Sequence, residues 1–324
     1  MNLEAQYPVE VECNAYIDGK AYKWTRIKIN KGGRTKFDEN TEIKRYSKEL
    51  QQKVSNGEEI VLPVFAYHGT GRLWGGKPIN YPMQIIDNGS RLLGYKNCLK
   101  STSNEYLFTE WFKSMRRIEI DEGIKSVEFS AVKNAIQQFL GGGITKIDYN
   151  LKEKELQVTM PNGDFLPFHM LSDGYQNAIG MIADTAFRMV TLNPQLKDKA
   201  ISETPGIILI DEIDLHLHPS WQRHIVKDLK RTFPKVQIIA TTHAPIVIST
   251  CSENEVIKLS GENEVEYIKS TTGWLAEDVL KDIMDVKSSR EPETEKMINR
   301  MRELYYKKLE ETITVSENIE LNYL

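Results

Sequence analysis

Two acidic residues, Asp211 and Glu212, follow directly after the apolar run Gly206 to Ile210. A run of this length and composition predicts a buried strand of a parallel sheet. Ligands bind at the carboxyl ends of such strands, where a rigid strand would hold both carboxylates. Asp211 could bind Mg²⁺ through its water shell, and Glu212 could polarise an attacking water. This is the Walker B pattern of nucleotide hydrolases, although a solvent-facing acid pair at a strand end would read the same way.

A second motif, Leu171-Ser172-Asp173-Gly174-Tyr175-Gln176, precedes a predicted helix that ends at Leu192. Ser172 is a suitable N-cap residue, and the backbone near Gly174 together with the helix dipole would attract an anion. The motif resembles the ABC signature LSGGQ. An ordinary capped amphipathic helix is the alternative interpretation, with Ala178, Met181, Ile182, Thr185 and Met189 as its apolar stripe.

His243 follows a second apolar run, Val236 to Ala240, in the order expected for a γ-phosphate-sensing switch histidine. A capping or core role is the usual alternative for a single histidine. Between the two runs lies the loop Asp214 to Pro219, at the position of the D-loop of ABC proteins. Its two histidines, with His224 nearby, suggest zinc only weakly because no cysteine or fourth ligand has suitable spacing.

The printed sequence contains no GxxxxGK[ST] segment, the Walker A loop that cradles phosphates. Gly71 to Lys77 has the glycine and lysine spacing, but Pro78 replaces the hydroxyl residue and removes a backbone N–H. We interpret this match as coincidental. Arg72 or His68 could still contact phosphate from this glycine-rich stretch, and an ordinary surface loop is the alternative.

The elements that position these residues follow from periodicity. Strand, helix and strand between Gly206 and Ala240 predict a β-α-β unit, with one helix over Trp221 to Phe233. An apolar run at Ile60 to Tyr67 predicts another buried strand. Further predictions are a hairpin turning at Asp18-Gly19, helices at 42–54, 106–117, 130–140 and 293–311, a β-meander at 144–168 and a frayed tail.

Composition limits the protein class. The 324 residues carry a net charge of −4, which gives no overall electrostatic reason to bind nucleic acid, although a local basic face is compatible with 42 Lys and Arg. Three distant cysteines suit reduced thiols. Because no signal peptide and no apolar run of membrane-spanning length is apparent, we expect a cytoplasmic protein without a membrane partner.

Long segments of the chain resemble the bacterial SMC/RecF-like ABC ATPases, which include predicted ATP-binding proteins involved in virulence and the ATPase subunits of Septu-type and retron-associated anti-phage systems. The resemblance is carried by LPVFAYHGTGRLW, RLLGYKNCL, LSDGYQ, GIILIDEIDLHLHPSWQ, TFPKVQIIATTHAP and GWLAEDVLKDIMDV. It implies an α/β fold: a P-loop NTPase-like (ABC/SMC head) mixed sheet with flanking helices, an antiparallel β-lobe and a helical insertion. The expected divisions are 1–99 (the β-lobe remainder and a Q-loop-like region, without Walker A), 100–143 (the insertion), 144–260 (the meander and motif core) and 261–324 (a helical tail).

The resemblance also implies a function. Two heads would dimerise head to tail around ATP and Mg²⁺, and an HNH-type nuclease is the implied partner, with nucleic acid as a further candidate. Glu212 and His243 would be catalytic, Asp211 would hold Mg²⁺, and Ser172, Asp173, Gly174, Gln176 and Arg72 would contact nucleotide. Because such proteins usually begin with a Walker A loop, a fragment or a non-catalytic scaffold that holds a nuclease is the alternative. A nuclease in its own right is a third, weaker interpretation, since neither an HNH pattern nor a toprim-like acidic pair is evident.

Overall fold

A three-stranded parallel sheet forms the centre of the protein in the computed structural model, which describes residues 6–37, 41–72, 90–100, 105–260, 264–286, 288 and 290–323. Its strand order is β4 (Val64–His68), β8 (Gly206–Ile210) and β9 (Val236–Ala240). His68, Ile210 and Ala240 are register partners at the carboxyl ends of the three strands. The residues that follow them therefore meet at one edge of the sheet.

Helix α5 (Asp173–Leu192) packs against β4 on one face of this sheet. Every residue from Asn177 to Val190 is buried. The predicted apolar stripe is thus correct but too narrow, because neighbouring elements surround the helix on all sides. On the sheet, alternate residues such as Val64, Ala66 and Ile208 face this core and are at most 1% exposed.

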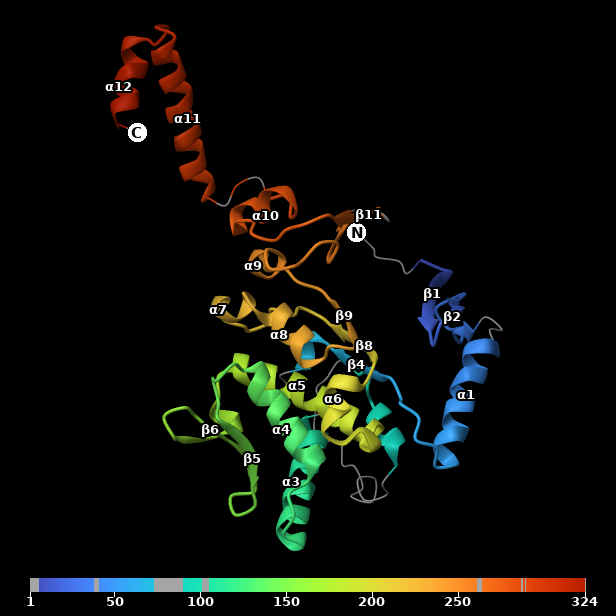
Figure 1. The fold of residues 1–324 in the computed structure, drawn as a ribbon. Helices are drawn as coiled ribbons and strands as arrows, with labels where there is room; N and C mark the ends of the chain where they lie inside the picture. The colour runs from blue at the N-terminus through green and yellow to red at the C-terminus, as the bar shows by residue number, and fades with distance from the viewer. Residues whose placement is uncertain are drawn as a thin grey trace.

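A helical segment packs against α5, and a meander packs against that helical segment (Figure 1). The segment consists of α3 (Glu105–Glu122) and α4 (Val127–Phe139), and Phe112 and Phe129 pack edge to face between them. The meander pairs β5 (Lys146–Asn150), β6 (Glu155–Thr159) and β7 (Phe165–Pro167) antiparallel. Both match the predicted helical insertion and β-meander.

An antiparallel lobe precedes the central sheet. β1 (Val9–Ile17) and β2 (Lys20–Lys28) form a hairpin, the short strand β3 (Lys36–Phe37) extends it, and α1 (Thr41–Ser55) packs against β2. The lobe lies at one side of the molecule, at the blue end of the chain in Figure 1. The predicted turn at Asp18-Gly19 is confirmed, and both residues adopt positive φ.

The remaining elements are short connections and the C-terminal part of the chain. They are η1 (Thr70–Arg72), η2 (Arg91–Tyr95), η3 (Phe168–Met170), η4 (Pro194–Lys199), α6 (Ala200–Glu203), α7 (Pro219–Gln222), α8 (Ile225–Thr232), α9 (Pro245–Ile248), β10 (Val256–Ser260), β11 (Glu264–Ile268), α10 (Ala276–Asp282), α11 (Pro292–Leu309) and α12 (Val315–Tyr323). Among the described residues, no helix is both long and apolar enough to span a bilayer.

The α/β prediction with its β-lobe and helical insertion is confirmed, but three details of the predicted elements are wrong. The strand predicted from Ile60 begins only at Val64, because Pro63 cannot donate a ladder hydrogen bond and the Leu62 amide bonds to the Asn193 side chain instead. The single helix predicted at 221–233 is divided at His224, whose φ of −133° is not helical.

The tail predicted to be frayed contains α12. Thr314 and Glu317 cap its first turn reciprocally, with each backbone N–H bonding to the other side chain. Arg300 and Lys307 of α11 form ion pairs with Glu320 and Glu317. Most of the Gly71 to Lys77 match lies outside the described residues.

Candidate functional site

Asp211 and Glu212 leave the carboxyl end of β8 and are held by the residue that leaves β9. The Thr241 hydroxyl donates to Asp211 Oδ1 at 2.7 Å and accepts from the Glu212 backbone N–H at 2.8 Å. Both acids are half-buried. Glu212 has a φ of 49°, an uncommon conformation for a residue with a side chain, and such strain clusters at functional sites. One threonine therefore fixes the Asp211 carboxylate and the Glu212 backbone.

Arg72 lies beneath this turn and is only 5% exposed. Its guanidinium donates to the backbone carbonyls of Asp211 and Glu212, at 2.6 and 2.7 Å. Its Nε donates to Asn177 Oδ1 at 2.5 Å, and Nη1 also donates to the Gly69 carbonyl at 3.1 Å. Burial lowers the pKa of Arg72 while the nearby acids Asp211, Glu212 and Asp214 raise it. The geometry supports a positioning role, and a contact between Arg72 and phosphate stays a prediction.

Asn177 extends this network from α5 to the loop after β8. Its Nδ2 donates to the Leu215 carbonyl at 2.7 Å, while its Oδ1 accepts from Arg72. One turn earlier, a Cβ on Gly174 would lie 2.8 Å from the His216 carbonyl oxygen. Gly174 therefore permits close contact between the start of α5 and the predicted D-loop, and the two motifs form one connected structure.

The predicted signature residues surround the amino end of α5. Ser172 is the N-cap residue, but its side chain makes no cap hydrogen bond, so the expected hydroxyl cap is absent. Ser172 and Asp173 are exposed. Gln176 Nε2 donates to the Leu171 carbonyl at 2.7 Å and braces the turn that leads into the helix. Exposed backbone amides and an uncommitted hydroxyl are compatible with anion binding.

His243 lies two residues beyond Thr241 and is exposed. The preceding Thr242 hydroxyl donates to Asp214 and accepts from the Ala244 N–H at 3.0 Å. The chain is thereby fixed on both sides of the histidine. Asp211, Glu212 and His243 are brought to the same edge of the sheet, as the sequence predicts.

His68 ends β4 inside the protein, only 3% exposed, with Nε2 3.0 Å from the Thr185 hydroxyl. Burial lowers its pKa to about 4, with Arg188 and Arg72 lowering it and Asp184 raising it. The suggestion that His68 contacts phosphate is wrong, because its neutral imidazole packs against α5. Its backbone carbonyl accepts from the Asp211 N–H at 2.8 Å and so continues the sheet.

The three histidines weighed as zinc ligands have separate environments. His218 accepts from the Ser220 N–H at 3.2 Å as the cap of α7, and His224 is paired with Asp228. His216 is exposed at a φ of 59°. Within the described part of the chain, no group of three or more His, Cys, Asp or Glu side chains is arranged to hold a metal ion.

The residues at the sheet edge suit Mg²⁺ with a nucleotide better than a metal caged entirely by protein. Mg²⁺ prefers oxygen ligands and commonly binds through one or two carboxylates plus waters and phosphates. Asp211 offers a carboxylate whose Oδ1 is already oriented by Thr241. Asp211 would hold the ion, which would supply charge neutralisation at transferring phosphate oxygens. Arg72 is close enough for its charge to interact with both acids, but its guanidinium donates to their backbone carbonyls.

Part of the chain, including this edge of the sheet, matches a protein-family model. Residues 100–249 match the model described as "AAA domain, putative AbiEii toxin, Type IV TA system". The matched segment includes α5, β8, β9 and His243, while Arg72 and the antiparallel lobe precede it.

The chain is also similar to curated proteins. It is 45% identical over 106 residues to the "Retron Vc95 probable ATPase" of Vibrio cholerae, in an alignment that covers 33% of this chain and 20% of that protein. It is 33% identical over 150 residues to "Septu protein PtuA" of Bacillus thuringiensis, which covers 43% of this chain and 37% of that protein. The chain thus matches much less than half the length of these relatives.

Solved structures similar to the chain include SMC heads. The "SMC head domain from Thermotoga maritima" aligns with a TM-score of 0.42 and 13% identity, over 83% of this chain and 77% of that one. An SmcHead bound to the C-winged helix domain of ScpA aligns with a TM-score of 0.44 and 14% identity, over 80% and 74% of the two chains.

Sequence reasoning missed Thr241 and Asn177. A hydroxyl residue that follows the strand next to a strand-end acid pair is a signal that could have identified Thr241. The role of Asn177 could not be predicted from local sequence, because its partners, Arg72 and the Leu215 carbonyl, are 105 and 38 residues away. Only the fold brings them together.

Proposed function

We propose that this chain supplies the hydrolytic edge of an ATPase that works in bacterial anti-phage defence. The observation that carries the proposal is the Thr241 hydroxyl, which bonds to the Asp211 carboxylate and to the Glu212 backbone at the carboxyl end of β8. Two similar proteins named as a retron probable ATPase and a Septu protein support the biological setting.

The proposed roles follow the geometry. Asp211 holds Mg²⁺ through water, Glu212 orients the attacking water, and exposed His243 contacts the γ-phosphate. The amino end of α5, with Ser172, Asp173, Gly174 and Gln176, takes the phosphate of an opposing subunit in a head-to-tail dimer. A nuclease is the proposed partner of that dimer.

Replacing Glu212 by Gln tests the catalytic assignment. Because the amide retains the shape of the carboxylate but cannot accept a proton, we expect ATP hydrolysis to fall by at least about 100-fold while binding of a fluorescent ATP persists. Glu153→Gln, in an exposed turn, is the matched control and should leave both quantities unchanged. Hydrolysis by Glu212→Gln at the wild-type rate would reject the role of Glu212.

The same preparations separate the enzyme from the scaffold. If the purified chain binds no ATP at all, the ATPase proposal fails and the non-catalytic scaffold that holds a nuclease is favoured. Light scattering after chromatography tests assembly: Glu212→Gln should double in mass with ATP but not with ADP. A mass that is identical under both conditions would exclude an ATP-dependent dimer.

A further inference from the structure

The loop after β8 and the segment after β9 remain bonded to each other beyond the ends of the two strands. The Ile213 N–H donates to the Thr241 carbonyl at 2.9 Å. One residue further along each segment, the Thr242 hydroxyl donates to Asp214 Oδ1. Because Thr242 immediately precedes His243, this side-chain bond lies directly beside the predicted switch histidine.

The turn that carries Asp214 is anchored to the amino end of α5. The Asp214 carbonyl accepts from the Leu217 N–H at 3.0 Å and so closes the turn. Within it, the Leu215 carbonyl accepts from the Asn177 side chain at 2.7 Å. Asp214 therefore offers Thr242 an acceptor whose backbone is held from two sides.

The Thr242 hydroxyl also determines the backbone that follows His243. It accepts from the Ala244 N–H at 3.0 Å, and Ala244 is the buried N-cap residue of α9. Thr242 and Asp214 are half-buried, whereas His243 is exposed. A hydroxyl that accepts from the backbone two residues on is a common local turn and needs no distant partner. The bond to Asp214 is an additional constraint, which joins this turn to the loop after β8.

We propose that Asp214 is a positioning residue for His243, and that it holds the imidazole in line with the γ-phosphate through the Thr242 hydroxyl. This inference rests on the ATPase function proposed above. The preceding residue, Thr241, already orients the Asp211 carboxylate, so two consecutive threonines set both sides of the sheet edge. A displacement of about 1 Å can cost about 100-fold in rate, so loss of the bond would slow hydrolysis more than it weakens ATP binding.

Steady-state ATP hydrolysis by two breaking and two conservative variants tests the proposal. Thr242→Val removes the hydroxyl and Asp214→Ala removes its acceptor, so each should lower kcat at least about tenfold while KM for ATP changes less than about twofold. Thr242→Ser and Asp214→Asn keep a hydroxyl and an acceptor oxygen, and they should recover most of the lost kcat. A purely structural role would instead lower the unfolding free energy in urea and leave kcat of the folded protein unchanged.

A double-mutant cycle with His243 tests whether the pair acts through the imidazole. His243→Ala should lower kcat at least about tenfold, and adding Thr242→Val should lower it by less than a further factor of about two. If Thr242→Val costs as much in the His243→Ala background as in the wild type, the proposal is overturned.

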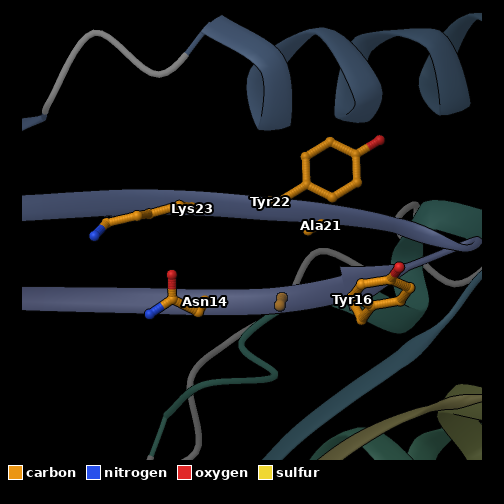
Figure 2. A pocket seen from close by; sticks show the side chains of 6 residues that line it. Asn14, Tyr16, Ala21, Tyr22 and Lys23 are labelled. Carbon is orange, nitrogen blue, oxygen red and sulfur yellow. The ribbon is translucent and has the colours of Figure 1, made fainter.

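Two control variants remove hydroxyls at other places. The Thr250 hydroxyl donates to the Val247 carbonyl at 2.7 Å, just after α9. Tyr16 of β1 is 79% exposed and borders the shallow hollow on the hairpin in Figure 2. Thr250→Val and Tyr16→Phe should both keep the wild-type kcat.

The outcomes separate this proposal from the one on which it rests. If the wild type hydrolyses ATP and Thr242→Val does so at the same kcat, the ATPase proposal stands and the positioning role of Asp214 is rejected. If the wild type does not hydrolyse ATP, both proposals fail. An equal loss of kcat in Thr250→Val and Thr242→Val would also reject the positioning role, because the effect would not depend on the bond to Asp214.

Discussion

Individual side chains at the sheet edge act mainly by holding the backbone in place. Thr241 fixes the two acids through one hydroxyl, while Arg72 bonds to their backbone carbonyls. Asp211 Oδ1 accepts from Thr241, whereas at Glu212 these bonds reach only the backbone and leave its carboxylate available to a ligand. A rigid backbone with an oriented Asp211 carboxylate and an available Glu212 carboxylate is what preorganised electrostatic catalysis requires.

His68 makes the folded state sensitive to acid. Its pKa is about 4 in the buried site and about 6.5 when the chain is unfolded. Between pH 4 and pH 6.5 the unfolded state binds a proton at His68 that the folded state does not bind. The contribution of His68 to the free energy of unfolding is therefore complete above pH 6.5 and declines as the pH falls toward 4. We expect acidification to remove about 3 kcal/mol of unfolding free energy through His68.

Urea unfolding of the wild type and of His68→Gln between pH 4 and 7 measures this effect. The variant should be less stable at pH 7 but should lose less stability on acidification than the wild type. His243→Gln, at an exposed site, should follow the wild-type pH dependence. Equal acid sensitivity of His68→Gln and the wild type would contradict the assignment.

At the scale of elements, Arg72 and Asn177 join three parts of the fold. Arg72 belongs to η1, Asn177 to α5, and the carbonyls that they bind belong to the loop after β8. The proposed signature helix and the proposed catalytic acids are therefore mechanically coupled. Removing either partner would leave buried polar groups without hydrogen bonds.

A double-mutant cycle tests this coupling. Arg72→Ala should lower the unfolding free energy by about 3 kcal/mol, and Arg72→Lys should recover little because an ammonium lacks the planar fork. With Asn177→Ala the two effects should be non-additive by at least about 1 kcal/mol. Arg223→Ala, at an exposed position, is the control with an expected change below about 0.5 kcal/mol. Additive losses would show that the two residues act independently.

For the whole molecule, the central sheet has one covered and one open face. Ile208 is 1% exposed toward α5, whereas Leu209 and Ile239, register partners on the opposite face, are 37% and 51% exposed. Parallel sheets are normally covered on both faces. The open face therefore places apolar side chains in contact with solvent.

Threonine substitutions compare the two faces. Leu209→Thr with Ile239→Thr should reduce binding of the dye ANS and cost less than about 1 kcal/mol of unfolding free energy, because little buried surface is lost. Ile208→Thr on the same strand should cost about 3 kcal/mol, since it places a hydroxyl in the core. If the outer pair costs as much as Ile208→Thr, that face is buried in solution.

Local sequence alone predicted β8 and β9, because a short apolar run bounded by acids or prolines fits few secondary structures other than a buried strand. It also predicted the start of α5 from the N-cap residue Ser172. It also predicted Asp211, Glu212 and His243 at one sheet edge, since parallel strands align their carboxyl ends. It could not predict that Arg72 is buried, that His68 is neutral, or that Asn177 joins two motifs. Those facts depend on hydrogen bonds between residues far apart in the chain, and only tertiary packing fixes which distant carbonyl a buried donor reaches and how far burial displaces a pKa.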